Sequence, residues 1–552
     1  MNIRLPLYAL VFSIGLFSLA CKSSRGLITK NDVKAGEKIL GINLSPAGVD
    51  TLIPYLSRNQ RGYDSLRSKS IPLDIQPPMY FDPRPIGFEM SDRNDPIEIP
   101  IKEDIIMPPK SALAFLPVTS LAGLIKSKQI SSVELTKFYL ARLKKHNEKL
   151  KCVISFTEEY ALEQAQKADD LLANGTYLGP LHGIPYGIKD LFALEGYPTT
   201  WGAEPYRNQT INQTATVIKK LESVGAVLIA KLVSGALARG DVWFGGTTKN
   251  PWDLEQGASG SSAGSGSAMS AGLCAFTIGT ETLGSIVSPA NRNGVTGLRP
   301  TYGRVSKSGV MSLSWTMDKA GPLCRTAEDC AIVLNAIHGY DAADPSTTKI
   351  KLAANPKALN NYKIAYLKSE FDKDTSDRAA NNIASLEVFR KMGYELVAVD
   401  LPKDIPYDGF DVILRAEAAA FFDELVRTGG VDKMVQQGRR SRANSLRQAR
   451  FIPAVEYIQA NRHRNILIQE FHKIISQYDA LISPTFGGRQ LLVTNLTGHP
   501  SICLPNGFDD KKHPTSFTIV GNLYDESSII NLAIAYQQIT DHEEKHPPLF
   551  LD

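Results

Sequence analysis

The sequence predicts one large α/β domain, in which helices cover a mostly buried sheet. A helical pattern leads into a short apolar strand three times, at residues 216–229, 383–399 and 465–482. Gly225 and Gly393 end the first two helices, because glycine readily adopts the left-handed conformation that follows a helix. Alternating helices and β-branched strands are typical of α/β proteins. No internal repeat interrupts the pattern, so residues 113–552 are expected to form a single domain.

The composition is that of an ordinary globular protein. The 552 residues are 43% hydrophobic and 21% charged, with a net charge of +4, which argues against a dedicated nucleic-acid binder. One stretch is strongly basic. It could bind an anionic substrate or lipid head groups, but we expect it to be the solvated face of a helix. The stretch consists of Arg439, Arg440, Arg442, Arg447 and Arg450.

Residues 1–20 resemble a signal peptide. Arg4 precedes an apolar stretch over residues 5–20, which is shorter than the roughly 20 residues that span a bilayer. Small residues then precede Cys21, as at a bacterial lipoprotein cleavage site. We therefore expect an exported, periplasmic lipoprotein whose lipid on Cys21 anchors it to a bacterial membrane; a plain N-terminal membrane anchor is the alternative.

Residues 21–112 are expected to be a tether and a small extension. Ser45-Pro46 is a good N-cap and first-turn pair for a helix to about residue 68, which we expect to pack on the main domain. Several prolines then favour extended chain. The main domain is expected from Leu113, and the capping box at residues 131–134 opens one of its first helices.

Five cysteines follow residue 21. An odd and sparse set is not a disulfide framework, and its spacings fit no common zinc site. One structural disulfide is compatible with the set, which consists of Cys152, Cys274, Cys324, Cys330 and Cys503.

The candidate chemistry lies in two runs of small and polar residues. Residues 257–272 are Gly, Ala or Ser except for Met269, and a polar turn is expected at residues 279–285 after an apolar strand. Two serines in such turns, with Lys189 upstream, suggest a serine hydrolase whose base is lysine. That role requires burial to lower the lysine pKa from about 10.4 towards 7–8, at a cost of about 4 kcal/mol. A structural turn at Lys189-Asp190 with the ammonium in solvent is an equally good interpretation.

Three segments together resemble the amidase signature family, and the resemblance extends over about residues 113–545. They are Gly-Ile-Pro-Tyr-Gly-Ile-Lys-Asp at 183–190, Gly-Ser-Ser-Ala-Gly-Ser at 260–265 and Gly-Thr-Glu-Thr-Leu-Gly-Ser-Ile at 279–286. The flanking residues 249–252, 293–301, 321–323 and 497–501 are similar too. The resemblance implies a central mixed β-sheet covered by helices on both faces, and hydrolysis of amide C–N bonds.

In that family a Ser-Ser-Lys triad cleaves the amide. The resemblance implies that Ser285 is the acylated nucleophile, Ser261 the bridging serine that follows a cis peptide bond, and Lys189 the base. It also implies an oxyanion hole formed by backbone N–H groups, which are those of Thr282, Leu283, Gly284 and Ser285. No GxGxxG segment after a strand and no P-loop lysine is present, and hydrolysis without a cofactor or metal is expected. The motif form is nearer to bacterial peptide amidases than to fatty acid amide hydrolases.

Four features depart from the family. The family commonly has Asp and Gly where Glu281 and Leu283 stand, and often Arg where Val287 stands. We expect the missing arginine to change the local electrostatics and Leu283 to narrow the site. Near the substrate path, family members often have polar residues where this chain has Val-Ser-Gly at residues 233–235.

Two other segments match motifs of different enzyme classes. Residues 260–264 fit the G-x-S-x-G elbow of α/β-hydrolase esterases, with Ser262 as nucleophile, but residues 251–257 are not expected to form the strand it needs. His542 and His546 match the H-E-x-x-H zinc motif, but Pro547 follows at once, so a polar helix end is expected. An exported non-catalytic binding lipoprotein is a further alternative. The export signal disfavours the tRNA-amidating member of the family.

Overall fold

The computed structural model describes residues 27–69, 71–72, 75–89 and 91–552. The chain divides into two compact units between Pro72 and Leu73. The expected signal peptide and Cys21 lie outside the described residues. Within those ranges, no helix is long and apolar enough to cross a membrane.

The described residues of the first unit form two helices, α1 (Lys30–Leu40) and α2 (Pro46–Arg67), which pack on each other. Helix α2 confirms the predicted helix: the Ser45 hydroxyl accepts a hydrogen bond from the Gly48 N–H, and Pro46 occupies the first turn. Helix α1 was not predicted, although a capping box between Thr29 and Asp32 opens it. That α2 packs on the main domain stays a prediction.

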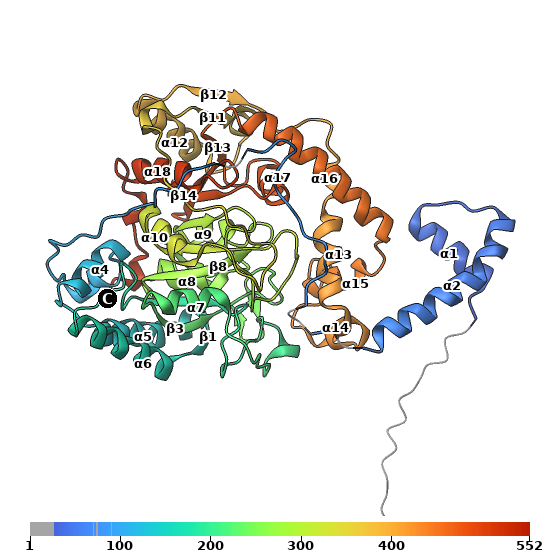
Figure 1. Cartoon of the computed structure of the whole chain (residues 1–552), viewed down its shortest axis with the longest axis horizontal. Helices are drawn as coiled ribbons and strands as arrows, with labels where there is room; N and C mark the ends of the chain where they lie inside the picture. Colours follow the sequence, from blue (N-terminus) through green and yellow to red (C-terminus); the bar gives the residue numbers. More distant parts are fainter. Residues whose placement is uncertain (1–26, 70, 73–74, 90) are drawn as a thin grey trace, which may run out of the picture. The chain divides into compact units, whose positions relative to one another are not determined.

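An eleven-stranded mixed sheet forms the centre of the second unit (Figure 1). Its strand order is β1-β3-β2-β8-β10-β9-β14-β15-β13-β11-β12. Strand β2 is parallel to β3 and β8, and β11 is parallel to β12 and β13, whereas the other neighbours are antiparallel. The strands are β1 (Val153–Phe156), β2 (Pro185–Lys189), β3 (Val227–Leu232), β8 (Phe276–Glu281), β9 (Thr296–Arg299), β10 (Lys319–Cys324), β11 (Ile364–Leu367), β12 (Leu396–Val399), β13 (Ala480–Pro484), β14 (Ser501–Phe508) and β15 (Pro514–Val520).

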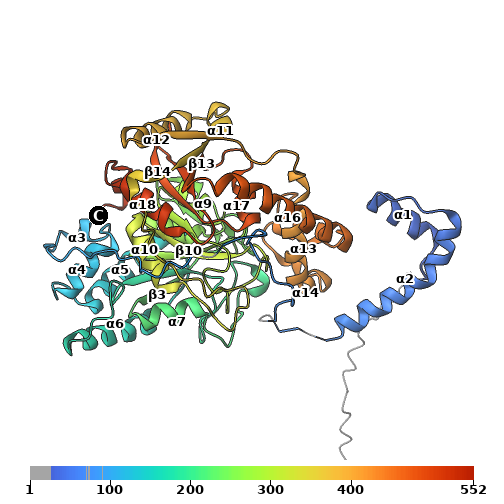
Figure 2. The same cartoon turned by 45° about the horizontal axis from the view of Figure 1, so that its top comes forward.

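Helices cover the sheet. Consecutive residues of β2, β3, β8 and β10 are all buried, which requires cover on both faces. In Figures 1 and 2, α5 and α6 lie towards the β1 end of the sheet and α12 towards the β12 end. The helices of this unit are α3 (Lys110–Leu113), α4 (Val118–Lys126), α5 (Ser132–Leu150), α6 (Glu158–Ala173), α7 (Thr216–Ser223), α8 (Ala263–Ser270), α9 (Val287–Asn293), α10 (Ala327–Ile337), α11 (Lys368–Asp372), α12 (Ala379–Lys391), α13 (Asp411–Phe421), α14 (Asp423–Arg427), α15 (Arg442–Ala449), α16 (Ala454–Ile475), α17 (Gln490–Thr497) and α18 (Glu526–Gln537).

The predicted α/β fold with a central mixed sheet is therefore confirmed. The capping box at residues 131–134 opens α5, and the three predicted helix-to-strand pairs are α7 with β3, α12 with β12, and α16 with β13. Helix α16 begins eleven residues earlier than expected, directly after Pro453. Strand β12 is only partly buried, because it is an edge strand of the sheet.

Two local expectations were wrong. Residues 253–257 do form a strand, β7, which pairs with β6 (Lys249–Asn250) in a two-stranded ribbon outside the main sheet. A second ribbon joins β4 (Val242–Trp243) to β5 (Gly246–Thr247). Residues 279–281 belong to β8 rather than to a turn, because they pair with residues 319–321 of β10.

The small residues after β7 form α8, a helix buried along its whole length. Glycine disfavours helices, but here the helix must approach other backbone closely. A Cβ on Gly264 would lie 2.3 Å from the Val233 nitrogen and 2.4 Å from the Cys152 oxygen. Close packing against β3 thus explains the composition that made this run conspicuous in the sequence.

Candidate active site

Lys189 is fully buried at the carboxyl end of β2, beside the parallel strand β8. Its Nζ donates a hydrogen bond to Ser261 Oγ at 2.7 Å and another to Thr280 Oγ1 at 2.9 Å. The alternative of a lysine with its ammonium in solvent is therefore wrong. The carboxyl ends of parallel strands are where α/β proteins place their sites, and Lys189 occupies one of them.

Burial makes Lys189 a much weaker base than an ordinary lysine. It lowers the pKa of Lys189 from 10.5 to about 7, although the carboxylates of Asp318 and Glu281 favour the charged form. All of its hydrogen-bond acceptors are neutral: the hydroxyls of Ser261 and Thr280, and the Thr280 carbonyl at 3.5 Å. A substantial fraction of Lys189 is consequently uncharged at neutral pH and can accept a proton.

The next residue, Asp190, fixes the backbone that carries Lys189. Its carboxylate forms a buried ion pair with Lys231 of β3 at 2.7 Å and accepts hydrogen bonds from the N–H and hydroxyl of Thr200. Lys231 also donates to the Pro198 carbonyl. These contacts hold Asp190 in place while Lys189 reaches Ser261.

Ser261 is fully buried just before α8 and follows a cis peptide bond to Gly260, as the family resemblance implied. Its carbonyl accepts a hydrogen bond from the Gly235 N–H at 3.1 Å. A Cβ on Gly260 would lie 1.9 Å from the Gly240 oxygen, so only glycine fits at residue 260. Residues 233–235, where family polar residues are replaced, thus include a direct support for the bridging serine.

Ser285 lies in the turn between β8 and α9. The Ser262 N–H donates to the Ser285 carbonyl at 3.2 Å, which joins this turn to the start of α8. Ser285 is 8% exposed, whereas Lys189 and Ser261 are inaccessible. The three predicted catalytic residues therefore come from β2, the start of α8 and the turn before α9, with Ser285 nearest to solvent.

The Glu281 carboxylate organises this turn. It accepts hydrogen bonds from the N–H groups of Ile286 and Val287 at 2.9 and 3.0 Å. In the part of the chain that the structure describes, the N–H groups of the preceding residues 283–285 have no acceptor. Because Glu281 accepts from the first two amides at the start of α9, the N–H groups of residues 283–285 remain available to donate to an oxygen of the substrate.

Glu281 has a guanidinium partner despite the departure at Val287. Arg299 of β9 forms a buried ion pair with it at 2.8 Å, and the Asn495 amide donates to the same oxygen at 2.8 Å. Burial raises the pKa of Glu281, but Arg299 and the backbone N–H groups more than offset this and hold it at about 2. The carboxylate is therefore charged throughout the physiological range.

Thr282 connects the turn to a second loop. Its hydroxyl donates to Asp318, whose other oxygen accepts hydrogen bonds from the N–H groups of Leu313 and Ser314. Burial raises the pKa of Asp318 above its ordinary value. The predicted oxyanion residues thus sit in a turn that buried carboxylates hold on two sides.

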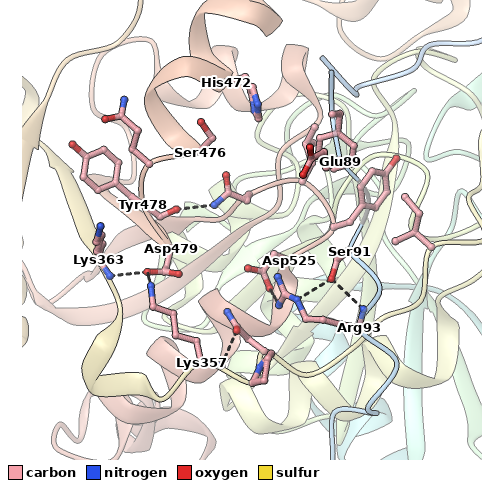
Figure 3. Close-up of a pocket in the computed structure, with 18 of the residues that line it drawn as sticks. Glu89, Ser91, Arg93, Lys357, Lys363, His472, Ser476, Tyr478, Asp479 and Asp525 are labelled. Carbon is pink, nitrogen blue, oxygen red and sulfur yellow. Dashed lines mark hydrogen bonds and ion pairs between the residues drawn. The ribbon is translucent and has the colours of Figure 1, made fainter. Parts of the chain in front are cut away.

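A pocket of about 380 Å³ opens over Ser285. Gly260, Thr282 and Leu283 also line it, and Leu283 is 37% exposed. That Leu283 narrows the site stays a prediction. A larger cavity of about 660 Å³ lies elsewhere and contains none of the predicted catalytic residues (Figure 3). Its charges are largely paired, as in Lys357–Asp479 and Arg93–Asp525.

The model of the amidase family matches residues 134–491. The chain belongs to the amidase signature family. A glutamyl-tRNA(Gln) amidotransferase subunit of Coxiella burnetii (strain Dugway 5J108-111) is 33% identical over 476 residues, which cover 77% of this chain and 97% of that protein. The corresponding protein of Marinomonas sp. (strain MWYL1) is 33% identical over 483 residues, or 78% and 98%. The structure of native peptide amidase from Stenotrophomonas maltophilia matches with a TM-score of 0.70 and 27% identity, covering 80% of this chain and 99% of that one.

In this amidase, Ser262 has a structural role rather than the role of a nucleophile. The Ser262 hydroxyl donates to the Thr280 carbonyl at 3.1 Å and accepts from the Thr280 N–H at 3.2 Å. It is fully buried and does not line the pocket. The elbow interpretation therefore fails on burial, although the strand whose absence argued against it is present as β7.

The H-E-x-x-H segment of the amidase is not a helix with two histidines on one face. His542 begins a 3₁₀ turn over residues 542–544, and His546 stacks on Phe115 with ring centroids 4.1 Å apart. Across the described ranges, no group of three or more His, Cys, Asp or Glu side chains could hold a metal ion. All five described cysteines are buried and free, so none of them forms the single disulfide that the sequence allowed.

Sequence reasoning missed several residues that complete the site of the amidase. Thr280 and Arg299 stand inside motifs that carried the family resemblance, but nothing in the motifs indicated their contacts. Asp318, Lys231 and Asn495 lie in segments without a signal of their own. Their roles depend on contacts between residues far apart in the sequence, such as that of Asn495 in α17 with Glu281 of β8.

Proposed function

We propose that this amidase hydrolyses amides by a Ser-Ser-Lys triad formed by Lys189, Ser261 and Ser285. The observation that carries the proposal is the 2.7 Å hydrogen bond between Lys189 and Ser261 in a fully buried setting that favours the neutral amine. A serine hydroxyl is a weak nucleophile without an adjacent base. A non-catalytic binding protein would have no need for a buried lysine of lowered pKa that is hydrogen-bonded to a serine.

The reaction has two halves. Neutral Lys189 accepts the Ser261 proton, Ser261 accepts the Ser285 proton, and Ser285 Oγ attacks the amide carbonyl carbon. As the tetrahedral intermediate collapses, the C–N bond breaks and the relay returns the proton to the departing amine. Water then attacks the acyl-enzyme by the same route and releases the acid and Ser285.

We assign the oxyanion hole to the backbone N–H groups of residues 282–285. The N–H groups of Leu283, Gly284 and Ser285 have no acceptor among the described residues, and Leu283 and Ser285 line the pocket. Removing one such donor in an enzyme of this type costs about 3–4 kcal/mol of transition-state stabilisation. The Glu281 carboxylate supports this arrangement, because it keeps the next two amides of the turn in place.

The test is release of amine or ammonia at pH 8 from a peptide amide, an aryl anilide and a long-chain amide, with hydrolysis of an ester followed in parallel. The protein is compared with its Ser285→Ala and Ser262→Ala variants. Loss of activity in Ser285→Ala, with activity kept in Ser262→Ala, supports the triad. The reverse pattern would point to Ser262, and no turnover by the unaltered protein would favour a binding role.

We also propose that the chain is exported and anchored by a lipid on Cys21. This proposal rests on the sequence alone, because residues 1–26 lie outside the described ranges. Growth of an expressing bacterium with labelled palmitate should label the protein, and Cys21→Ala should abolish the label. An unlabelled protein in the cytosolic fraction would contradict both parts.

A second candidate is the amidotransferase role that the names of the two bacterial relatives state, because this chain matches almost their full length. An amidotransferase differs from a stand-alone amidase in the amide that it prefers as a nitrogen donor. Glutamine added to the panel separates the two: turnover of glutamine well above that of the peptide amide would favour the amidotransferase-like role.

A further inference from the structure

The pocket over Ser285 is strongly basic. Its lining includes one carboxylate among the described residues, that of Asp411, and five guanidinium groups. They come from three parts of the chain: the loop after β3, α13, and the residues at the start of α15. The five are Arg239, Arg415, Arg439, Arg440 and Arg442.

Most of this charge is not neutralised by the protein. Arg415 pairs with Asp411 at 2.7 Å. Within the described residues, no carboxylate forms an ion pair with Arg239, Arg439 or Arg440. The pocket therefore holds a local excess of positive charge, and such clefts concentrate anions.

Arg442 adds a buried charge to the same wall. Its Nε and one terminal nitrogen donate to the carbonyls of Leu237 and Ala238 at 3.0 and 3.1 Å, and no carboxylate in the described ranges pairs with it. Burial lowers the pKa of Arg442 to about 9, and the neighbouring Arg239 acts in the same direction. Leaving a guanidinium so poorly compensated is costly unless an anion arrives to pair with it.

The same basic stretch contains a natural contrast. Arg447 is paired with Asp432 and Arg450 with Asp423, and neither lines the pocket. The stretch thus divides into two neutralised arginines and three that face the cavity. The sequence-based expectation of a solvated helix face fails for Arg442, which is buried, whereas Arg439 and Arg440 are exposed but lie before α15.

The basic wall is also adjacent to the proposed chemistry. Arg239 precedes Gly240, whose carbonyl lies directly against Gly260, the residue before the bridging serine. Gly260, Thr282 and Ser285 line the same pocket as the arginines. A substrate whose carbonyl sits at Ser285 therefore extends into the basic region.

We propose that the amidase selects amides that carry a second, anionic group such as a carboxylate beside the scissile bond. This proposal rests on the proposed amide hydrolysis at Ser285. The planar guanidinium groups match the two oxygens of a carboxylate, and several arginines can bind it from different sides. The anion can sit on the acyl or on the amine portion of the substrate, and the experiment distinguishes these two placements.

The test uses two matched pairs of substrates. Glutaryl-4-nitroanilide against pentanoyl-4-nitroanilide places a carboxylate on the acyl side, and 4-acetamidobenzoate against 4-acetamidotoluene places it on the amine side. The measured quantity is the ratio of kcat/KM for the anionic and neutral member of each pair. We expect at least about a tenfold preference for the anion in one pair, and a weaker preference as the NaCl concentration is raised from about 50 to about 500 mM.

Variants then locate the effect. Arg439→Gln/Arg440→Gln should reduce the ratio about 2- to 30-fold, the range of two exposed charge pairs. The matched control Arg447→Gln/Arg450→Gln removes the same number of charges from the same stretch and should leave the ratio unchanged. Turnover without any anion preference, or equal loss of preference in both double variants, overturns the proposal.

Failure of the proposed hydrolysis is recognised separately. If Ser285→Ala keeps full activity, or no substrate is cleaved, the proposed triad fails rather than the anion site. In that case the affinities of the Ser285→Ala protein for 4-acetamidobenzoate and 4-acetamidotoluene decide, because binding requires no turnover. Equal affinities for the two compounds would overturn the anion site. Tighter binding of 4-acetamidobenzoate would support it, provided that this advantage is lost when Arg439 and Arg440 are also replaced by glutamine.

Discussion

Replacement of Lys189 by methionine is expected to abolish activity and yet to stabilise the fold. A pKa lowered from 10.5 to about 7 means that burial of Lys189 costs about 5 kcal/mol of folding free energy at pH 7. Methionine has a similar length and carries no such cost. The hydroxyls of Ser261 and Thr280 would each lose one hydrogen bond, worth about 0.5–1.5 kcal/mol. Together the two losses offset about 1–3 kcal/mol of the gain. We therefore expect the variant to be more stable by about 2–4 kcal/mol at pH 7.

The gain should depend on pH in a defined direction. Between pH 7 and 10.5 the unfolded chain binds a proton at Lys189 that the folded chain does not, so the cost falls as pH rises. Below pH 7 both states bind the proton and the cost is constant. The advantage of Lys189→Met should shrink by about 1.4 kcal/mol per pH unit above pH 7.

Urea unfolding followed by tryptophan fluorescence at pH 6, 7, 8 and 9 measures this difference, and comparison with the parent protein cancels other titrating groups. Lys231→Met is the matched control: it removes an equally buried lysine from the ion pair with Asp190, and should destabilise by about 3–5 kcal/mol. A Lys189→Met protein that is no more stable than its parent at pH 7, with no pH dependence, would refute a neutral buried Lys189.

Three further outcomes are expected. The acid limb of kcat/KM for a non-ionising amide should lie near pH 7, because only neutral Lys189 accepts a proton, so the value at pH 6 should be about one tenth of the plateau; a flat profile from pH 5 to 9 would exclude this base. Ser262→Ala should lower stability by about 1–3 kcal/mol, because the N–H and carbonyl of Thr280 both lose the Ser262 hydroxyl, while kcat stays within about tenfold; inactivation without destabilisation would contradict a structural role. Glu281→Gln should cost about 3–5 kcal/mol in urea unfolding by leaving Arg299 unpaired, with a fall in kcat from the disturbed turn; unchanged stability would show that the pair contributes nothing.

The sequence by itself determined the elements whose signals are local. Capping residues and glycine stops depend on contacts within three or four residues, so the starts of α2 and α5 and the pairs around residues 216–229 followed from the sequence. The family motifs likewise singled out Lys189, Ser261 and Ser285 as the residues of the proposed triad. Local signals failed where tertiary contacts override propensity, as in α8, whose glycines allow close packing against β3, and in β7, which needs its partner β6.

The tertiary structure alone decided how the site is charged. Burial beside β8 is what lowers the pKa of Lys189 to about 7. Arg299 pairs with Glu281 although Val287 stands where the family often has an arginine, and Asn495 reaches Glu281 across 214 residues of sequence. The basic stretch looked uniform in the sequence, but Asp432 and Asp423 neutralise only Arg447 and Arg450. Arg439, Arg440 and Arg442 are left without an ion pair among the described residues. Charge at a site is a sum over neighbours in space, and those neighbours are distant in the chain.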